Sequence, residues 1–326
     1  MDSTDIALTR RSLLAGLLGI PAAAPAAERT SRMRFGFTTY QWGQAWDIPT
    51  LIANCARAGA LGVELRTSMK YGHGVELDIA PQTRREVKKR FEDSPVKLLG
   101  IACGERFDSP DPAKLEAAIE AAKGYLKLSH DVGSRGVRVF PNDFHKDVPQ
   151  EKTVEQIARS LNVVGQHAGD LGQMVRVENH GTAGRLATLR RILDQVDQPS
   201  VRVMLNSDAR DAEGGKFAEN FALVKDRLAD VLHMHDLEDS KFPYQLQADL
   251  LIDIGWDGWW LVEQSSKVPD PAQALIEMRK QWDELVARSL KRVAQTIVVC
   301  RLRQGRPHKT MACPTVQLIP GPCTRS

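Results

Sequence analysis

The sequence has few cysteines and no long apolar segment. Its 326 residues include five cysteines, an odd number without a CxxC pair. A disulfide framework is therefore not expected in a chain of this length. Three of the five, Cys300, Cys313 and Cys323, lie near the C-terminus, where a bridge from Cys313 to either neighbour stays open if the protein is exported. No segment approaches about 18 consecutive apolar residues, so a transmembrane domain is not expected.

Several nucleotide-binding and hydrolase motifs are also missing. The chain has no Walker A motif, no GxSxG elbow and no HExxH pair. The turn after the first expected strand reads TTYQWG, and it lacks the glycine pattern that a doubly wound dinucleotide-binding sheet needs. An organic cofactor is therefore not expected, and an open doubly wound sheet is the weaker of two α/β alternatives.

Basic residues are concentrated at one end of the chain. From residue 289 onward there are seven basic residues and no acidic ones, so the first 288 residues carry a net charge of −4 although the whole chain carries +3. A mildly acidic body does not favour a nucleic-acid partner. The net charge of −4 also makes a DNA-cleaving enzyme less favoured than the functions considered below.

The first 27 residues have the pattern of an export signal. Residues 9–14 read TRRSLL, a twin-arginine pattern, and a short apolar stretch at 13–20 leads into PAAAPAA at 21–27. Paired arginines, a short hydrophobic region and an A-x-A-like site are typical of a secretory signal. We therefore expect a periplasmic or secreted protein.

Residues 33–288 alternate eight times between short strand patterns and longer helix patterns. Apolar, β-branched runs predict strands at 33–39, 61–66, 96–102, 136–140, 174–178, 201–206, 230–235 and 258–263. Segments with 3.6-residue periodicity predict helices at 48–59, 82–92, 112–132, 151–171, 185–196, 217–228, 244–255 and 271–288. Strict alternation implies a parallel sheet, and eight units in about 255 residues fit a single-domain (β/α)8 TIM barrel.

Polar residues follow the last four expected strands. Glu178 ends the fifth, Asn206 and Asp208 follow the sixth, His233 lies on the seventh, and Glu263 ends the eighth. In a TIM barrel the C-terminal strand ends face one pocket, so these residues would meet there. Carboxylate, imidazole and amide donors suit Mn²⁺, Mg²⁺, Co²⁺ or Zn²⁺. The pattern predicts a divalent-metal site, with an ion pair to a neighbouring Arg or Lys as the alternative for each glutamate.

At these positions the chain resembles the sugar phosphate isomerase/epimerase family of xylose isomerase-like TIM barrels. The resemblance covers roughly residues 35–287 and rests on the stretches FGFTTYQWG, GVELRT, GVRVFPN, VRVENHG, LNSDARD, LHMHDL and LVEQSSKVPD. It implies one divalent ion held by Glu178, His233, Glu263 and the residue at position 206. Asn206 stands where the family has Asp, and a neutral amide is a weaker ligand unless Asp208 compensates.

The resemblance also implies a reaction. It is that of a metal-dependent isomerase or epimerase, which removes a proton next to the carbonyl of a sugar or keto-sugar and forms an enediolate. Glu178 and Glu263 are the expected base and acid. Two alternatives stay open: a lyase or dehydratase acting on an inosose-like keto-polyol, and a non-catalytic sugar-binding barrel with a degraded metal site. A small carbohydrate is the expected partner, and the sequence does not indicate an oligomeric state.

Six other polar or aromatic side chains near the same strand ends are candidates for binding the substrate. They are His73, His180, His235, Glu64, Trp42 and Arg138. His235 lies two residues from His233, so both would share one strand face. Trp42 could stack on a sugar ring. Each of the six has a structural alternative, such as an ion pair between Glu64 and an arginine.

The C-terminal segment differs from the barrel sequence. We expect the eighth helix to end near Arg288, beyond which the composition changes and, after Val299, helical periodicity is lost. Residues 289–326 are basic and rich in Pro and Cys, which predicts a disordered tail that contributes nothing to the pocket.

Overall fold

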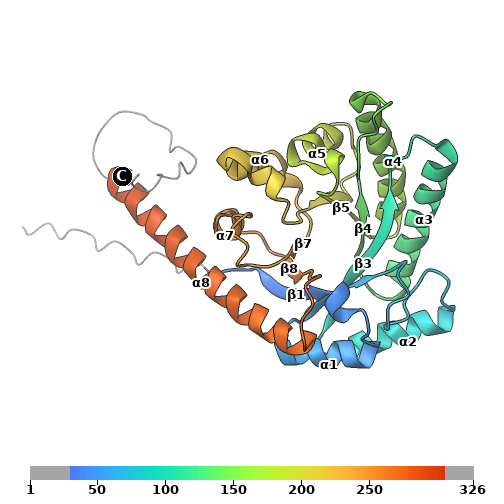
Figure 1. Ribbon diagram of the computed structural model, residues 1–326, viewed down its shortest axis with the longest axis horizontal. Helices are drawn as coiled ribbons and strands as arrows, with labels where there is room; N and C mark the ends of the chain where they lie inside the picture. Colours follow the sequence, from blue (N-terminus) through green and yellow to red (C-terminus); the bar gives the residue numbers. More distant parts are fainter. Residues whose placement is uncertain (1–29, 305–326) are drawn as a thin grey trace, which may run out of the picture.

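The computed structural model describes the backbone of residues 30–304 and the side chains of residues 30–295. Parallel strands and helices alternate around one ring, and the helices lie outside the strands (Figure 1). The strands are β1 (Arg34–Thr38), β2 (Gly62–Arg66), β3 (Lys97–Arg106), β4 (Gly136–Phe140), β5 (Met174–Glu178), β6 (Val201–Met204), β7 (Val231–Met234) and β8 (Trp259–Val262). The predicted (β/α)8 TIM barrel is confirmed.

The helices follow the strands in strict order. They are α1 (Ile48–Ala58), α2 (Pro81–Glu92), α3 (Pro112–Asp131), α4 (Gln150–Asp170), α5 (Leu186–Leu193), α6 (Phe217–Val224), α7 (Tyr244–Asp253) and α8 (Pro271–Gln304). Local sequence explains where some of them begin. Asp47 caps α1 by accepting a hydrogen bond from the Thr50 backbone N–H at 2.9 Å, and Asp111 caps α3 in the same way from Ala113 at 2.9 Å.

The ring is closed unevenly. Hydrogen-bonded ladders run in the order β6-β5-β4-β3-β2-β1-β8-β7. Between β6 and β7 the backbone of Ala229 donates to the Val203 carbonyl at 2.7 Å, and that of His233 donates to the Leu205 carbonyl at 2.8 Å. These two bonds bring the strand that precedes Asn206 beside the strand that carries His233.

Side chains alternate between the two faces of the ring. On β5, Val175 and Val177 belong to the large hydrophobic core, whereas Arg176 and Glu178 are buried polar residues. Period-2 alternation places the first pair against the helices and the second pair inside the barrel. The same reasoning places Glu64 of β2 and Arg138 of β4 inside. The barrel interior is therefore charged at a depth where TIM barrels usually pack branched aliphatic residues.

Two glycines make room for a buried arginine inside the barrel. A Cβ atom on Gly100 of β3 would overlap the Arg176 guanidinium and would lie 2.7 Å from the Gly136 carbonyl oxygen. A Cβ on Gly136 would lie 3.0 Å from Cζ of Arg176. The absence of a side chain at these two positions on neighbouring strands lets Arg176 cross the interior with no solvent exposure.

Helix α8 differs from the expectation. It does not end near Arg288 but continues to Gln304, and it extends beyond the barrel wall (Figure 1). Ser289 and Val293 are buried, and Arg292 forms an ion pair with Asp249 of α7 at 2.9 Å. These contacts explain why the helix continues into a segment whose composition suggested a tail.

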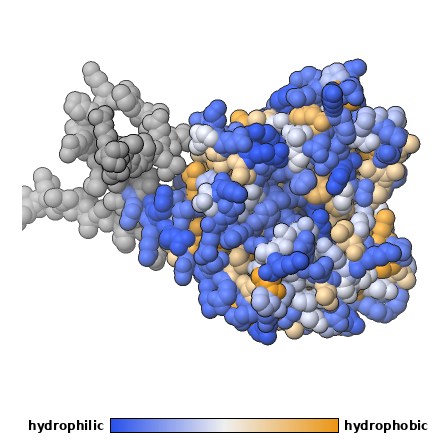
Figure 2. All heavy atoms as spheres, viewed as in Figure 1, coloured by the Kyte–Doolittle hydropathy of each residue, from blue (hydrophilic) through white to orange (hydrophobic). Residues whose placement is uncertain are grey.

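Within residues 30–304, no helix combines the length and the apolarity needed to cross a membrane. The face of the molecule in Figure 2 is mainly hydrophilic, with apolar residues scattered over it. Several predictions fall outside the residues whose side chains are described. They concern the export signal at 1–27, the cysteines Cys300, Cys313 and Cys323, and the part of the predicted tail at 289–326 that lies beyond residue 304.

The space that Gly100 provides can be tested with a second glycine on the same strand. Gly100→Ala should lower the free energy of unfolding by about 1–3 kcal/mol, because the new methyl group overlaps Arg176 and backbone. Gly104→Ala meets no atom within 4 Å and should leave stability unchanged or raise it by up to about 1 kcal/mol. Urea unfolding of both variants measures the difference. Equal effects would contradict the role of Gly100.

Candidate metal centre and its pocket

Three predicted ligands meet at the C-terminal end of the barrel. Glu178 ends β5, His233 lies on β7, and Glu263 directly follows β8. One oxygen or nitrogen from each lies within 4.8 Å of the others, and all three side chains are buried. His233 Nδ1 lies 3.3 Å from Glu178 Oε1 and 3.3 Å from Glu263 Oε2. Residues 30 to 85 positions apart in the sequence thus form one cluster.

Each carboxylate is shared between an arginine and the histidine. Glu178 pairs through Oε2 with Arg138 Nη1 at 3.2 Å and turns Oε1 toward His233. Glu263 pairs through Oε1 with Arg66 Nη1 at 3.1 Å and turns Oε2 toward His233. The two arginines therefore fix both carboxylates and leave one oxygen of each directed at a common point.

His233 is held from inside the barrel by a third carboxylate. Its Nε2 lies 2.8 Å from Glu64 Oε2, and Glu64 also lies 3.6 Å from Arg176 Nη1. Arg176 in turn donates from Nε to Asp230 at 2.9 Å. A carboxylate on the far nitrogen is the usual way in which a metal-binding imidazole is oriented. The near nitrogen, Nδ1, is thereby directed at Glu178 and Glu263.

The charges of this cluster shift the pKa values of its members strongly. Burial lowers the pKa of His233, but the neighbouring carboxylates, Glu263 first, raise it well above its usual range. Burial raises the pKa of Glu263, yet His233 holds it well below its usual range. Burial raises the pKa of Glu178, but the charge of Arg138 and the contact with His233 together lower it below its usual range. Both glutamates are therefore ionised at neutral pH.

The three donors fit a divalent ion. Metal–ligand bonds of about 2.1 Å to two atoms 3.3 Å apart give an angle of roughly 100°, between octahedral and tetrahedral values. Two carboxylates and one imidazole suit Mn²⁺, Mg²⁺, Co²⁺ or Zn²⁺. Glu64 supplies the carboxylate that orients the histidine from its far nitrogen. The residues that would hold the ion are Glu178, His233 and Glu263.

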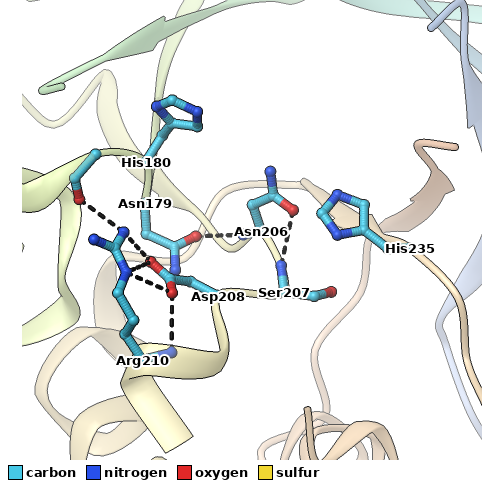
Figure 3. A pocket seen from close by; sticks show the side chains of 8 residues that line it. Asn179, His180, Asn206, Ser207, Asp208, Arg210 and His235 are labelled. Carbon is cyan, nitrogen blue, oxygen red and sulfur yellow. Dashed lines mark hydrogen bonds and ion pairs between the residues drawn. The ribbon is translucent and has the colours of Figure 1, made fainter. Parts of the chain in front are cut away.

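A small pocket lies beside these residues. It is lined by Asn179, His180, Gly181, Asn206, Ser207, Asp208, Arg210 and His235, most of which Figure 3 labels. His235 lies beside Asn206 in that view, and its Nε2 is 3.4 Å from Glu263 Oε2. His180 is exposed, and its ring packs on Phe140 with centroids 4.7 Å apart. His180 and His235 are therefore the predicted substrate-binding residues that the pocket presents to solvent.

The Asp208 carboxylate is held by a neighbouring arginine. Its carboxylate pairs with the Arg210 guanidinium, with Nε at 2.9 Å from Oδ1, and caps the following 3-10 segment by accepting from the Arg210 backbone N–H at 3.0 Å. Figure 3 shows Asp208 turned toward Arg210. Asp208 is not in the cluster of Glu178, His233 and Glu263, because β6 ends at Met204 and the chain bends before Asp208. Its role as a ligand stays a prediction.

Four predicted substrate-binding residues have structural partners instead. Trp42 is buried and donates from Nε1 to the Ser266 carbonyl at 2.8 Å, which ties the first βα loop to the last. Both ring nitrogens of His73 are occupied by the backbone of Arg66 and Val75. Glu64 orients His233, and Arg138 pairs with Glu178; both are buried, with 0% and 1% of their side-chain surfaces exposed. His73, Glu64, Trp42 and Arg138 thus have the structural partners that the sequence left open as alternatives, and substrate binding by them stays a prediction.

Sequence reasoning missed three residues of the network. Arg66 pairs with Glu263, Arg176 pairs with Glu64, and Asn179 accepts a hydrogen bond from the backbone of Asn206. A signal was present for Arg176, since it alternates with Glu178 in the apolar run MVRVE and must share its face. Arg66 shares a strand face with Glu64 in the same way.

Most of the sequence matches a known family. The profile described as xylose isomerase-like TIM barrel matches residues 52–289. A comparison with curated proteins finds no match.

Solved structures share this fold at low sequence identity. L-ribulose 3-epimerase is 17% identical, with a TM-score of 0.68 over 85% of this chain and 100% of the other. The apo form of 3-keto-D-glucoside 4-epimerase from E. coli is 16% identical, with a TM-score of 0.62 over 78% and 98%. The IolI protein with a bound zinc atom is 17% identical, with a TM-score of 0.63 over 79% and 99%. At these identities the likeness shows a common fold.

The ion pair between Arg138 and Glu178 should be essential to stability. Arg138→Met should lower the free energy of unfolding by roughly 3–5 kcal/mol, because it leaves Glu178 buried without its partner. Adding Glu178→Gln should recover part of this loss. Arg159→Met, which breaks an exposed pair with Glu155, should cost less than about 1 kcal/mol. Urea unfolding tests all three, and a loss below about 1 kcal/mol for Arg138→Met would contradict this account.

Proposed function

Because the chain belongs to the family of xylose isomerase-like TIM barrels, we propose that it is a metal-dependent isomerase or epimerase of a sugar or keto-sugar. The observation that carries the proposal is the convergence of Glu178, His233 and Glu263 beside an open polar pocket. Two structures with the same fold are of proteins named as epimerases, 3-keto-D-glucoside 4-epimerase and L-ribulose 3-epimerase, and a third, the IolI protein, holds a zinc atom. We further propose export through the twin-arginine pattern at residues 9–14.

The pocket suits a small polyhydroxylated ligand. His180, His235 and the amide of Asn206 line it and offer hydrogen-bond donors and acceptors. Arg210, which is paired with Asp208, adds a fixed charge at the rim. A sugar hydroxyl chain can exchange hydrogen bonds with such groups, whereas a large apolar ligand would find few partners.

The two glutamates are placed for proton transfer. Both are ionised before substrate binds, so either can accept a proton from a carbon next to a carbonyl. Return of a proton to the neighbouring carbon, with the hydroxyl proton passing between the two oxygens, is isomerisation. Delivery of a different proton from the opposite face by the second glutamate, which first takes one from solvent, inverts the centre and is epimerisation. A divalent ion, when bound, supplies Lewis-acid stabilisation of the oxygen charge that develops as the proton leaves.

The chain's own residues prepare this step. Arg138 and Arg66 fix one oxygen of each glutamate, which restricts the other oxygen to a single direction. Burial of the cluster keeps water away from both carboxylates and strengthens their interactions with the substrate. Glu64 keeps the imidazole of His233 from turning.

The proposal is tested by solvent exchange and metal content. Incubation with a panel of keto-sugars in D₂O should place deuterium next to the carbonyl, as NMR would detect. Glu178→Gln and Glu263→Gln should lower that rate by about 10²–10⁴-fold, because each removes a base, and should also reduce the bound metal. Asp208→Asn should retain the metal, because Asp208 is paired with Arg210.

The outcomes separate the alternatives. Deuterium uptake accompanied by an enone absorbance would favour the dehydratase. A folded protein that binds sugar but holds no metal and exchanges no proton would favour a binding barrel and refute the proposed reaction.

The role of Glu64 can be measured separately. Glu64→Gln should weaken metal binding by about 10–100-fold, because the amide no longer holds His233 Nε2 with a full charge. Titration calorimetry with Co²⁺ or Zn²⁺ measures the change, and the exposed substitution Glu155→Gln serves as the control. Unchanged affinity in Glu64→Gln would show that Glu64 balances Arg176 without acting on the metal site.

A further inference from the structure

The family resemblance implies four protein ligands to one ion, with an aspartate at position 206. Asn206 is the residue at which this chain departs from that set. Its amide nitrogen contacts the two carboxylate oxygens that face His233, Glu178 Oε1 and, at 3.3 Å, Glu263 Oε2. The amide therefore lies where a fourth ligand to a shared ion would stand. Whether its oxygen or its nitrogen faces that point decides whether it can bind a cation.

The neighbouring backbone fixes the orientation of the amide. The N–H of Ser207 donates to Asn206 Oδ1 at 2.8 Å. If the amide were turned over, its NH₂ group would meet the Ser207 N–H, and two donors would face each other. The oxygen therefore stays on Ser207, and the NH₂ group stays on the two carboxylates, where it makes favourable charge-assisted hydrogen bonds.

A second set of contacts keeps Asn206 in place. Its backbone N–H donates to Oδ1 of Asn179, and Nδ2 of Asn179 donates to Asp211 Oδ2 at 3.1 Å. Asp211 is 1% exposed and also accepts from the Leu186 backbone N–H at 3.0 Å. Because Asn179 and Asp211 are both buried and hold each other in place, Asn206 cannot easily move aside and turn its amide.

We propose that Asn206 braces Glu178 and Glu263 and is not a metal ligand, so that the chain holds its ion with three protein ligands. This inference rests on the proposed metal-dependent function. An amide NH₂ has no lone pair to offer a cation, whereas an aspartate could keep one oxygen on Ser207 and direct the other at the ion. A three-ligand site binds its ion more weakly and leaves an additional coordination position for oxygen atoms of the substrate.

Metal titrations of three proteins test the proposal without any activity assay. Asn206→Asp should bind Co²⁺ or Zn²⁺ at least about tenfold more tightly than the wild type, because it adds a charged fourth ligand. Asn206→Ala should bind within about threefold of the wild type, since no metal–ligand bond is lost. Asn54→Asp adds the same charge on α1, away from the site, and should leave the affinity unchanged. Circular dichroism and urea unfolding confirm that each variant is folded.

The results separate this proposal from the function on which it rests. A tenfold or larger loss of affinity in Asn206→Ala would identify Asn206 as a ligand and overturn the proposal, as would equal affinities of Asn206→Asp and the wild type. Metal binding by Asn206→Asp alone would overturn the three-ligand site in the wild type and, with it, the metal-dependent function. Failure of every variant to bind metal would overturn both.

Discussion

The requirement that shapes the barrel interior is the balance of buried charge. Three carboxylates, Glu64, Glu178 and Glu263, lie within or at the mouth of the ring, and each has an arginine partner, Arg176, Arg138 and Arg66. A buried charge without a partner is penalised by several kcal/mol, so exchanging one member of a pair alone costs stability. His233 contacts all three carboxylates and joins the inner pair to the outer ones.

The architecture could be predicted because its signals are local and repeated. Runs such as MVRVE and VRVM contain enough β-branched residues to mark strands, and 3.6-residue periodicity marks the helices between them. The end of α8 was predicted too early, because the change to a basic composition after Arg288 outweighed the apolar spacing of Leu290 and Val293. The continuation of α8 is stabilised by residues distant in sequence, as in the ion pair between Arg292 and Asp249 of α7.

The site was predictable to the extent that strand ends determine it. Glu178, His233 and Glu263 end up together because their strands are neighbours in a closed ring. The choice between Asn206 and Asp208 depended on a bend after Met204 that no periodicity reports. The partners of Glu64 and Arg138 could not be assigned either, because the sequence shows that charges share the interior but not which of them touch.

The uneven closure of the ring has a mechanical consequence. Ladders join the other adjacent strands, whereas two backbone bonds near Ala229 and His233 join β6 to β7. Thermal breathing of the cylinder will open this seam first, because local fluctuations follow the least-bonded boundary. The seam runs between Asn206 and His233. The spacing within the cluster of Glu178, His233 and Glu263 therefore depends on the strand boundary that has the fewest backbone hydrogen bonds.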